Sequence, residues 1–157
     1  MQKITPFLWF NGEAEEAMNY YVSIFKNSKI GKVSRYGEHG PGPKGSVMSA
    51  EFVLEGQDFM ALNGGGTTFK FSPAISFLVS CETQSEVDEL WTKLGEGGAP
   101  NRCGWLQDKF GVSWQIIPKH LGEYLGDKDP QKAGKVMQAM LQMDKINIQA
   151  LKDAYAN

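Results

Sequence analysis

Hydrophobic periodicity in the first half of the chain predicts one strand, one helix and three further strands. Residues 3–10 are apolar and rich in aromatic side chains, which is typical of a strand. The segment Asn11-Gly12-Glu13 can start a helix, and we expect that helix to end near Asn27. Its apolar positions recur at helical spacing: Ala14, Ala17, Met18, Tyr21 and Phe25. Strands are then predicted at 30–36, 46–54 and 58–63, with a glycine- and proline-rich loop at 37–46.

The second half repeats this order of elements. Residues 74–81 alternate in the manner of a half-buried strand, and residues 83–86 form a capping box, TQSE. The helix behind this box has an apolar stripe made of Val87, Leu90, Trp91 and Leu94. Residues 95–100 break that helix, 101–106 can form one or two short strands, and 112–117 form the last strand. The chain is therefore predicted to be α+β, with βαβββ modules at 1–66 and 67–118.

Residues 119–157 are predicted to form a helical C-terminal extension. Asp129-Pro130 is a favoured helix start, and Asn147 can cap a second helix. The methionines in this tail have the spacing of packing residues rather than of a cofactor site. The tail can add to an intermolecular surface or fold back on its own module, and the sequence leaves both possibilities open.

Composition excludes several classes of function. The 157 residues suit one compact domain of two modules, and 16 Lys and Arg against 18 Asp and Glu give a net charge of −2. A protein without a basic face is not expected to bind nucleic acid. No apolar run approaches the roughly 20 residues of a membrane span, and the N-terminus lacks the pattern of a signal peptide. Two cysteines, Cys81 and Cys103, make no disulfide framework, so we expect inert buried thiols in a cytoplasmic protein.

Three segments carry a resemblance to a known family. They are LNGGG at 62–66, AISFLVSCET at 74–83 and RCGWLQDKFGVSWQIIP at 102–118. Together with the repeated element order, they resemble the PhnB-like branch of the vicinal oxygen chelate superfamily, which includes glyoxalase, bleomycin resistance and dioxygenase proteins. The resemblance implies two modules that form a cup-shaped mixed sheet with a pocket inside, and commonly a homodimer. This branch often carries the label 3-demethylubiquinone-9 3-methyltransferase.

The resemblance also implies where a metal site would lie. Metal-dependent relatives take four ligands from the first and last strands of the modules, and these positions correspond here to Pro6, Asn63 (or Ala61), Ser76 (or Ala74) and Gln115. Proline has no ligating side chain, and serine and amide oxygens bind divalent metals weakly without a carboxylate. The two histidines, His39 and His120, fall outside the strands that would face the cup. We therefore expect no bound metal.

The glycine run at 64–66 is the one candidate for a cofactor loop. Such a loop can cradle a phosphate or nucleoside only when a helix N-terminus follows it, whereas here the β-prone segment TTFKFSP follows. We expect this run to be the crossover between modules and expect no cofactor, S-adenosylmethionine included.

Alternation along the strands predicts a pocket of neutral polar groups with apolar walls. If Ile75, Phe77 and Val79 face the helix, Ser76 faces the cup, and the same argument places Gln115 there. The predicted pocket comprises Asn63, Ser76, Gln115, Leu8, Phe10, Trp105 and Phe110, while Trp9, Trp91 and Trp114 are predicted to be core. Alternatively, the three polar residues bond buried backbone or water and fix the strand pairing.

Three functions remain compatible with the sequence. The first is a dimeric small-molecule-binding protein with a degenerate metal site, whose ligand is hydrogen-bonded and oxygenated or aromatic. The second is an enzyme, either of the glyoxalase and dioxygenase type or with the methyltransferase activity of the family label. The third is an interaction protein with a vestigial pocket. Homodimer formation is expected because aromatic-rich strands and a Met-rich tail offer more apolar surface than one small domain covers.

Overall fold

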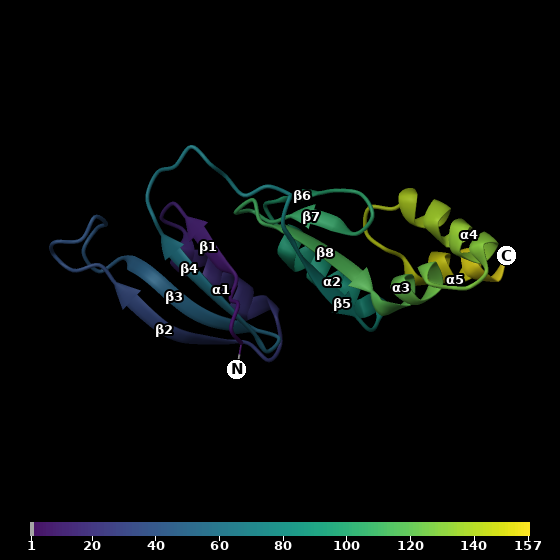
Figure 1. Ribbon diagram of the computed structural model, residues 1–157, viewed down its shortest axis with the longest axis horizontal. Coiled ribbons are helices and arrows are strands. Elements are labelled where there is room, and N and C mark those ends of the chain that lie inside the picture. Colours follow the sequence, from purple (N-terminus) through teal and green to yellow (C-terminus); the bar gives the residue numbers. More distant parts are fainter. Residues whose placement is uncertain (1) are drawn as a thin grey trace. The chain divides into compact units, whose positions relative to one another are not determined.

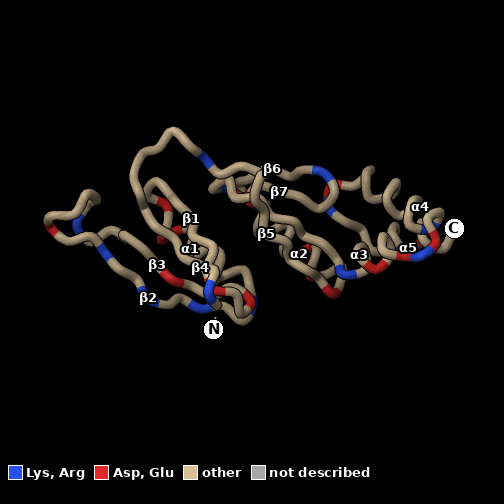
Figure 2. The backbone as a smooth tube through the Cα atoms, in the orientation of Figure 1, with Lys and Arg blue, Asp and Glu red and all other residues tan. Residues whose placement is uncertain are grey.

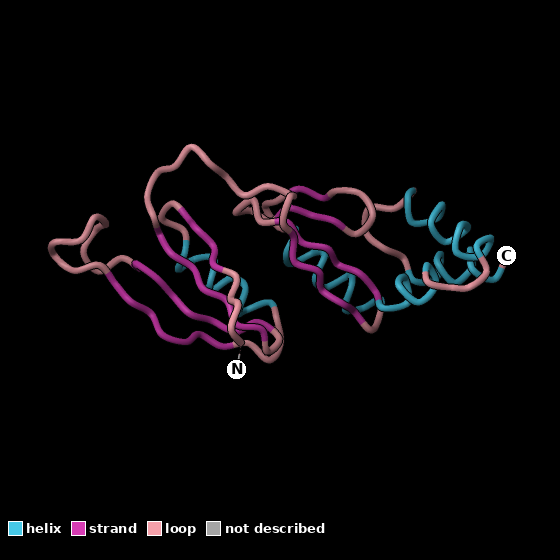
Figure 3. Tube along the Cα trace, viewed as in Figure 1, coloured by secondary structure: helices cyan, strands magenta, loops and turns pink. Residues whose placement is uncertain are grey.

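The computed structural model describes residues 2–157 and has two compact units, the first ending at Lys70 and the second beginning at Phe71 (Figure 1). Each unit contains a four-stranded mixed sheet with a helix packed on one face (Figure 3). The α+β class, with two βαβββ modules and a helical tail, is confirmed. No helix within residues 2–157 combines the length and apolar character that a membrane crossing requires.

The first module contains β1 (Phe7–Phe10), α1 (Ala14–Ile24), β2 (Lys29–Arg35), β3 (Val47–Leu54) and β4 (Gln57–Asn63). Its strand order is β1-β4-β3-β2, with β1 parallel to β4 and the other pairs antiparallel. Tyr21 of α1 stacks on Phe52 of β3 with ring centroids 6.4 Å apart, and both are buried. The helix therefore covers the face of the sheet that carries Phe52.

The second module contains β5 (Ser76–Cys81), α2 (Gln84–Gly95), β6 (Ala99–Pro100), β7 (Trp105–Gln107) and β8 (Ser113–Pro118). Its order, β5-β8-β7-β6, with β5 parallel to β8, is the arrangement of the first module again. Thr83 caps α2 by accepting a hydrogen bond from the Glu86 amide at 3.2 Å. The predicted repeat and the cap of its second helix are confirmed.

The tail forms three helices: α3 (Lys119–Leu125), α4 (Pro130–Leu141) and α5 (Ile148–Ala156). They pack around a buried cluster made of Leu121, Val136, Ile146 and Leu151. Asp129 and Asn147 cap α4 and α5 as predicted. The tail belongs to the same compact unit as the second module, so it folds back on its own chain.

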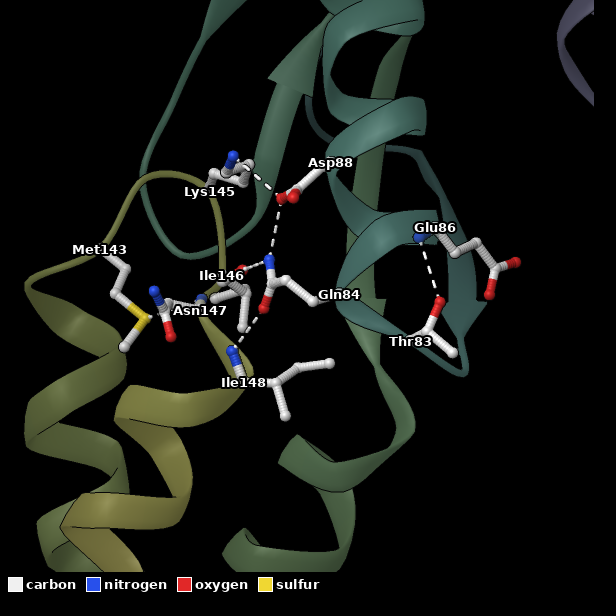
Figure 4. Close-up of polar contacts among 9 residues, drawn as sticks. All are labelled: Thr83, Gln84, Glu86, Asp88, Met143, Lys145, Ile146, Asn147 and Ile148. Atoms are coloured by element: carbon white, nitrogen blue, oxygen red, sulfur yellow. Dashed lines mark hydrogen bonds and ion pairs between the residues drawn. The ribbon is translucent and has the colours of Figure 1, made fainter.

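Gln84, the first residue of α2, joins the tail to the second module (Figure 4). Its side-chain amide donates to the Ile146 carbonyl at 3.0 Å and to Asp88 Oδ1 at 2.9 Å, and its carbonyl oxygen accepts from the Ile148 amide at 2.7 Å. Lys145 adds an ion pair with Asp88 at 2.9 Å. The pKa of Asp88 is lowered, first by the Gln84 amide and then by Lys145. One side chain thus satisfies backbone groups on both sides of the turn that starts α5.

Candidate functional site

The face of the second sheet opposite α2 gathers the predicted site residues of this module; this face, called the open face below, is exposed at Leu78 and is covered by the tail at Ile117. Phe77 and Trp114 are register partners whose rings lie 5.4 Å apart, and Trp114 is buried on the α2 side. Because side chains alternate along a strand, Ser76, Leu78 and Gln115 point to the opposite face. Trp105 is the register partner of Gln115 on β7, and Leu78 is 57% exposed. Ser76 and Gln115 therefore share one face of the sheet, opposite α2, whereas Ile75 precedes β5 and is exposed.

Ser76 and Gln115 are hydrogen-bonded to each other across the parallel pair β5 and β8. Gln115 Nε2 donates to Ser76 Oγ at 2.9 Å. This bond uses one amide hydrogen of Gln115 and one lone pair of Ser76, so the Gln115 carbonyl oxygen can still accept and the Ser76 hydroxyl can still donate. The pair therefore presents one acceptor and one donor at the same place.

Ser113 is a further polar residue on this face, together with Gln107 and Ser80, and sequence analysis missed it. It lies two residues before Gln115 on β8 and is the register partner of both Ser76 and Gln107. Its side chain is 2% exposed, and its hydroxyl has no hydrogen-bond partner among residues 2–157. The period of two that placed Gln115 on this face also applies to Ser113 and could have found it.

The second sheet carries no formal charge. Its four strands read SFLVSC, AP, WLQ and SWQIIP, which contain no Asp, Glu, Lys or Arg (Figure 2). The strands of the first module, by contrast, contain Lys29, Lys32, Arg35, Glu51 and Asp58. The open face of the second sheet can therefore act through neutral hydrogen bonds and apolar contact.

The turn before β8 is built around Asp108, another residue whose role the sequence analysis did not identify. Asp108 is 3% exposed, and its Oδ1 accepts from the amides of Phe110 and Val112 at 2.9 and 3.0 Å. Its Oδ2 accepts from the indole of Trp114 at 2.9 Å. These bonds fix the start of β8 and hence the position of Gln115. A carboxylate at the head of a glycine-containing turn is the sequence signal that could have indicated this role.

Phe110 lies within this turn rather than on a strand. It is half-buried, and Lys109 Nζ lies 5.4 Å from the centre of its ring. Its contribution to the predicted pocket wall stays a prediction.

Asn63 has a structural role in the first module. Its Oδ1 accepts from the amides of Gly12 and Ala14 at 3.0 and 2.9 Å, and its Nδ2 donates to the Val47 carbonyl at 2.9 Å. Asn63 therefore caps the N-terminus of α1, a role that the predicted cap at residues 11–13 does not fill. The sequence left open whether the polar residues bind a ligand or bond to buried backbone, and for Asn63 the structure shows bonds to backbone.

Leu8 and Phe10, predicted as pocket walls, lie in the core of the first module. They are 7% and 2% exposed, and Leu8 pairs with Ala61 on the face of the sheet that α1 covers. Phe7 and Trp9 point to the opposite face and are 50% and 42% exposed, so the prediction that Trp9 is core is also wrong. All four residues of β1 are apolar, and alternation cannot choose a face when both faces of a strand look alike.

The comparisons with known proteins agree with this fold. A family model described as 3-demethylubiquinone-9 3-methyltransferase matches residues 2–117, which include both modules. The chain belongs to this family. A PhnB protein from Bacillus cereus, described as a candidate 3-demethylubiquinone-9 3-methyltransferase, is 47% identical with a TM-score of 0.72. That alignment covers 74% of this chain and 99% of the Bacillus chain, and the resemblance to the PhnB-like branch is confirmed.

More distant structures share the fold alone. A Pseudomonas aeruginosa protein is 23% identical, with a TM-score of 0.64, over 75% of this chain and 98% of that one. The fosfomycin resistance protein FosX from Listeria monocytogenes, solved with Mn(II) and sulfate, is 14% identical, with a TM-score of 0.54, over 80% and 97% of the two chains. The comparison with curated proteins gave no match. The tail of this PhnB-like chain begins where the family match ends.

We predict that the purified PhnB-like protein carries no stoichiometric divalent metal. Asn63 Oδ1 already accepts two backbone amides, and Ser76 and Gln115 are neutral groups bonded to each other, so these positions supply no anionic ligand for a divalent metal. Within residues 2–157, no three His, Cys, Asp or Glu side chains are grouped so that they could hold a metal ion. Elemental analysis after purification without chelators is the test. One tightly held zinc, nickel or manganese ion per chain would contradict this prediction.

The two thiols should differ in reactivity. Cys81 is fully buried, as predicted, and burial followed by the charge of Glu86 raises its pKa from 9.0 to about 12. Cys103 is only half-buried. We expect iodoacetamide at pH 8 to label Cys103 at least about 100-fold faster than Cys81, because the thiolate is the reactive species. Mass spectrometry of tryptic peptides measures both rates, urea-unfolded protein is the control, and equal rates in the folded protein would contradict the assignment.

Proposed function

We propose that the chain binds a neutral small molecule, oxygenated and with an aromatic or apolar body, on the open face of the second sheet. The proposal rests on the 2.9 Å hydrogen bond between Gln115 and Ser76, which leaves one acceptor and one donor on that face. A ligand hydroxyl can donate to the Gln115 carbonyl oxygen, and a ligand carbonyl can accept from Ser76. Trp105 beside Gln115 supplies an aromatic surface, and Leu78 supplies an apolar one.

The absence of formal charge on the second sheet supports a neutral ligand over an ionic one. An ion that leaves water for this face would lose hydration without gaining an ionic partner on the four strands. A phenol, an aryl ketone or a quinone loses less hydration and can use both the hydrogen bonds and the apolar area.

The test is a titration followed by two-dimensional ¹H–¹⁵N NMR. 4-Hydroxyacetophenone, which has both a hydroxyl and a carbonyl, should shift the side-chain signals of Gln115 and Trp105. Gln115→Leu should weaken binding about 10-fold or more, because a ligand group then loses its partner on this face. Gln57→Leu, on the exposed start of β4, is the matched control and should leave the affinity unchanged. Binding that survives Gln115→Leu, or no shift at millimolar ligand, would reject the proposal.

Methyl transfer is the second candidate, because the family description names it. The glycine run Gly64 to Gly66 is followed by a loop that leads directly into β5, with no helix between β4 and β5. A loop of this kind offers no helix N-terminus to a nucleoside or phosphate. We therefore expect no binding of S-adenosylmethionine by calorimetry, and micromolar affinity would favour the enzyme over the binding protein.

We also propose that the protein is a homodimer. The face of the first sheet opposite α1 exposes two large apolar residues of β1, Phe7 at 50% and Trp9 at 42%. Apolar patches of this kind usually mark contact surfaces, and a second copy of the chain is the proposed occupant. Light scattering on a sizing column distinguishes a mass near 17.4 kDa, which would reject the dimer, from twice that value.

A cytoplasmic location is part of the proposal. It is supported by the two cysteines, which are both free thiols in the structure. Reducing compartments keep such thiols unpaired.

A further inference from the structure

A groove at the C-terminal end of α2 arises because the second module has a shorter hairpin than the first. β2 and β3 contain seven and eight residues, whereas β6 and β7 contain two and three. The helices α1 and α2 have similar lengths, 11 and 12 residues. The last turns of α2 therefore have less sheet to pack against, and side chains that a longer hairpin would cover are left at a groove.

The groove has a volume of about 560 Å³ and lies on the α2 side of the sheet, away from the proposed ligand face. Its lining comes from the end of α2 and from the short hairpin: Trp91, Thr92, Gly95, Glu96, Pro100 and Leu106. Trp91 was predicted to be core but is only half-buried, because the shortened hairpin does not reach over it. The volume falls within the range of small-molecule sites in proteins.

The lining combines an indole, an apolar wall and one carboxylate. Pro100 and Leu106 supply apolar surface, and among residues 2–157 Glu96, immediately after α2, is the only charged residue of the lining. Nearby lysines already have partners, since Lys93 pairs with Glu89 at 2.7 Å and Lys109 Nζ lies 5.4 Å from the centre of the Phe110 ring. A carboxylate and an indole that line the same groove are a combination that attracts an organic cation.

We propose that this groove is a second binding site, which takes an organic ammonium ion with an aromatic or branched apolar body. The cation lies at the indole of Trp91 and is balanced by the carboxylate of Glu96, while the apolar body displaces water from Pro100 and Leu106. This site is separate from the open face that carries Ser76 and Gln115, and it does not depend on that proposal.

The test is a titration of the full-length protein with benzyltrimethylammonium, followed by the indole N–H signals in ¹H–¹⁵N NMR spectra. The chain has four tryptophans, so each of the four signals reports on a different place. The Trp91 signal, assigned by its loss in Trp91→Phe, should shift with millimolar affinity, whereas those of Trp9, Trp105 and Trp114 should not. Benzyl alcohol and benzoate, which share the aryl group without the positive charge, should bind at least about fivefold more weakly.

Glu96→Gln should raise the dissociation constant of benzyltrimethylammonium about threefold to tenfold, and added salt should raise that of the unmodified protein. Glu123→Gln, which removes an exposed carboxylate on α3, is the matched control and should change nothing. The proposal would be overturned if the Trp91 signal does not move at a ligand concentration about 20-fold above the expected millimolar dissociation constant. The proposal would also be overturned if benzyl alcohol binds as tightly as benzyltrimethylammonium, or if Glu96→Gln leaves the dissociation constant of benzyltrimethylammonium unchanged. Either result would describe an apolar groove without a preference for cations. A shift of Trp105 alone would place the cation on the open face and overturn the groove site as well.

Discussion

Replacing Asp108 by asparagine is expected to lower the free energy of unfolding of the second module by about 2–4 kcal/mol. The carboxylate is 3% exposed and accepts three hydrogen bonds from Phe110, Val112 and the indole of Trp114. Asparagine has the same shape but only one acceptor oxygen. If that oxygen keeps the two backbone amides, the new NH₂ group faces the Trp114 N–H, and two buried donors are left without an acceptor.

Urea denaturation and hydrogen exchange together measure this effect. Exchange of the Phe110 and Val112 amides should accelerate with the loss of stability, while α1 of the first module serves as an internal reference. Asp144→Asn, at an exposed carboxylate in the tail, is the matched control and should change stability by less than about 0.5 kcal/mol. A double-mutant cycle with Trp114→Phe should give a coupling energy of about 1 kcal/mol or more. Independent, additive effects of the two substitutions would show that the indole bond does not stabilise the turn.

Replacing Gln84 by alanine is expected to lower the free energy of local opening of the tail, in which it separates from the second module, by about 1–3 kcal/mol. The substitution removes the acceptor of the Ile148 amide and the donor to the Ile146 carbonyl, and Ile146 is fully buried. Both backbone groups lie at the turn that begins α5, so the helix loses its attachment where it starts. The ion pair of Lys145 with Asp88 remains, but both side chains are nearly half exposed, at 42% and 48%, and the pair contributes little by itself.

Hydrogen exchange resolved by residue is the appropriate measurement, because the tail can open while the sheet stays folded. Amides of α4 and α5 should exchange about 5- to 100-fold faster in Gln84→Ala, and those of α1 should be unchanged. Gln138→Ala, at an exposed position of α4, is the control and should leave α5 as protected as before. If α5 keeps its protection in Gln84→Ala, apolar packing around Leu151 alone holds the tail, and the hydrogen bonds of Gln84 are dispensable.

The sequence by itself determined the element order, the repeat and most helix starts. These features depend on local causes: a period of two or of 3.6 residues, and a capping side chain within three residues of the amide that it binds. Thr83, Asp129 and Asn147 were found for this reason. Gln115 and Ser76 were assigned to one face because each strand has a polar residue between apolar neighbours.

Only the tertiary structure decided features that join residues distant in sequence or that lack a local signal. β1 is apolar on both faces, so the positions of Leu8 and Phe10 in the core depended on which face α1 covers. Asn63 serves a helix that begins 49 residues earlier, and Gln84 binds a turn more than 60 residues later. Trp91 lies at a groove because two other segments, β6 and β7, are short. Periodicity indicates whether each position of a segment is buried or exposed. It does not identify the neighbouring segments, because these depend on how the whole unit packs. Buried polar groups in particular bond to partners that are close in the fold but distant in the sequence.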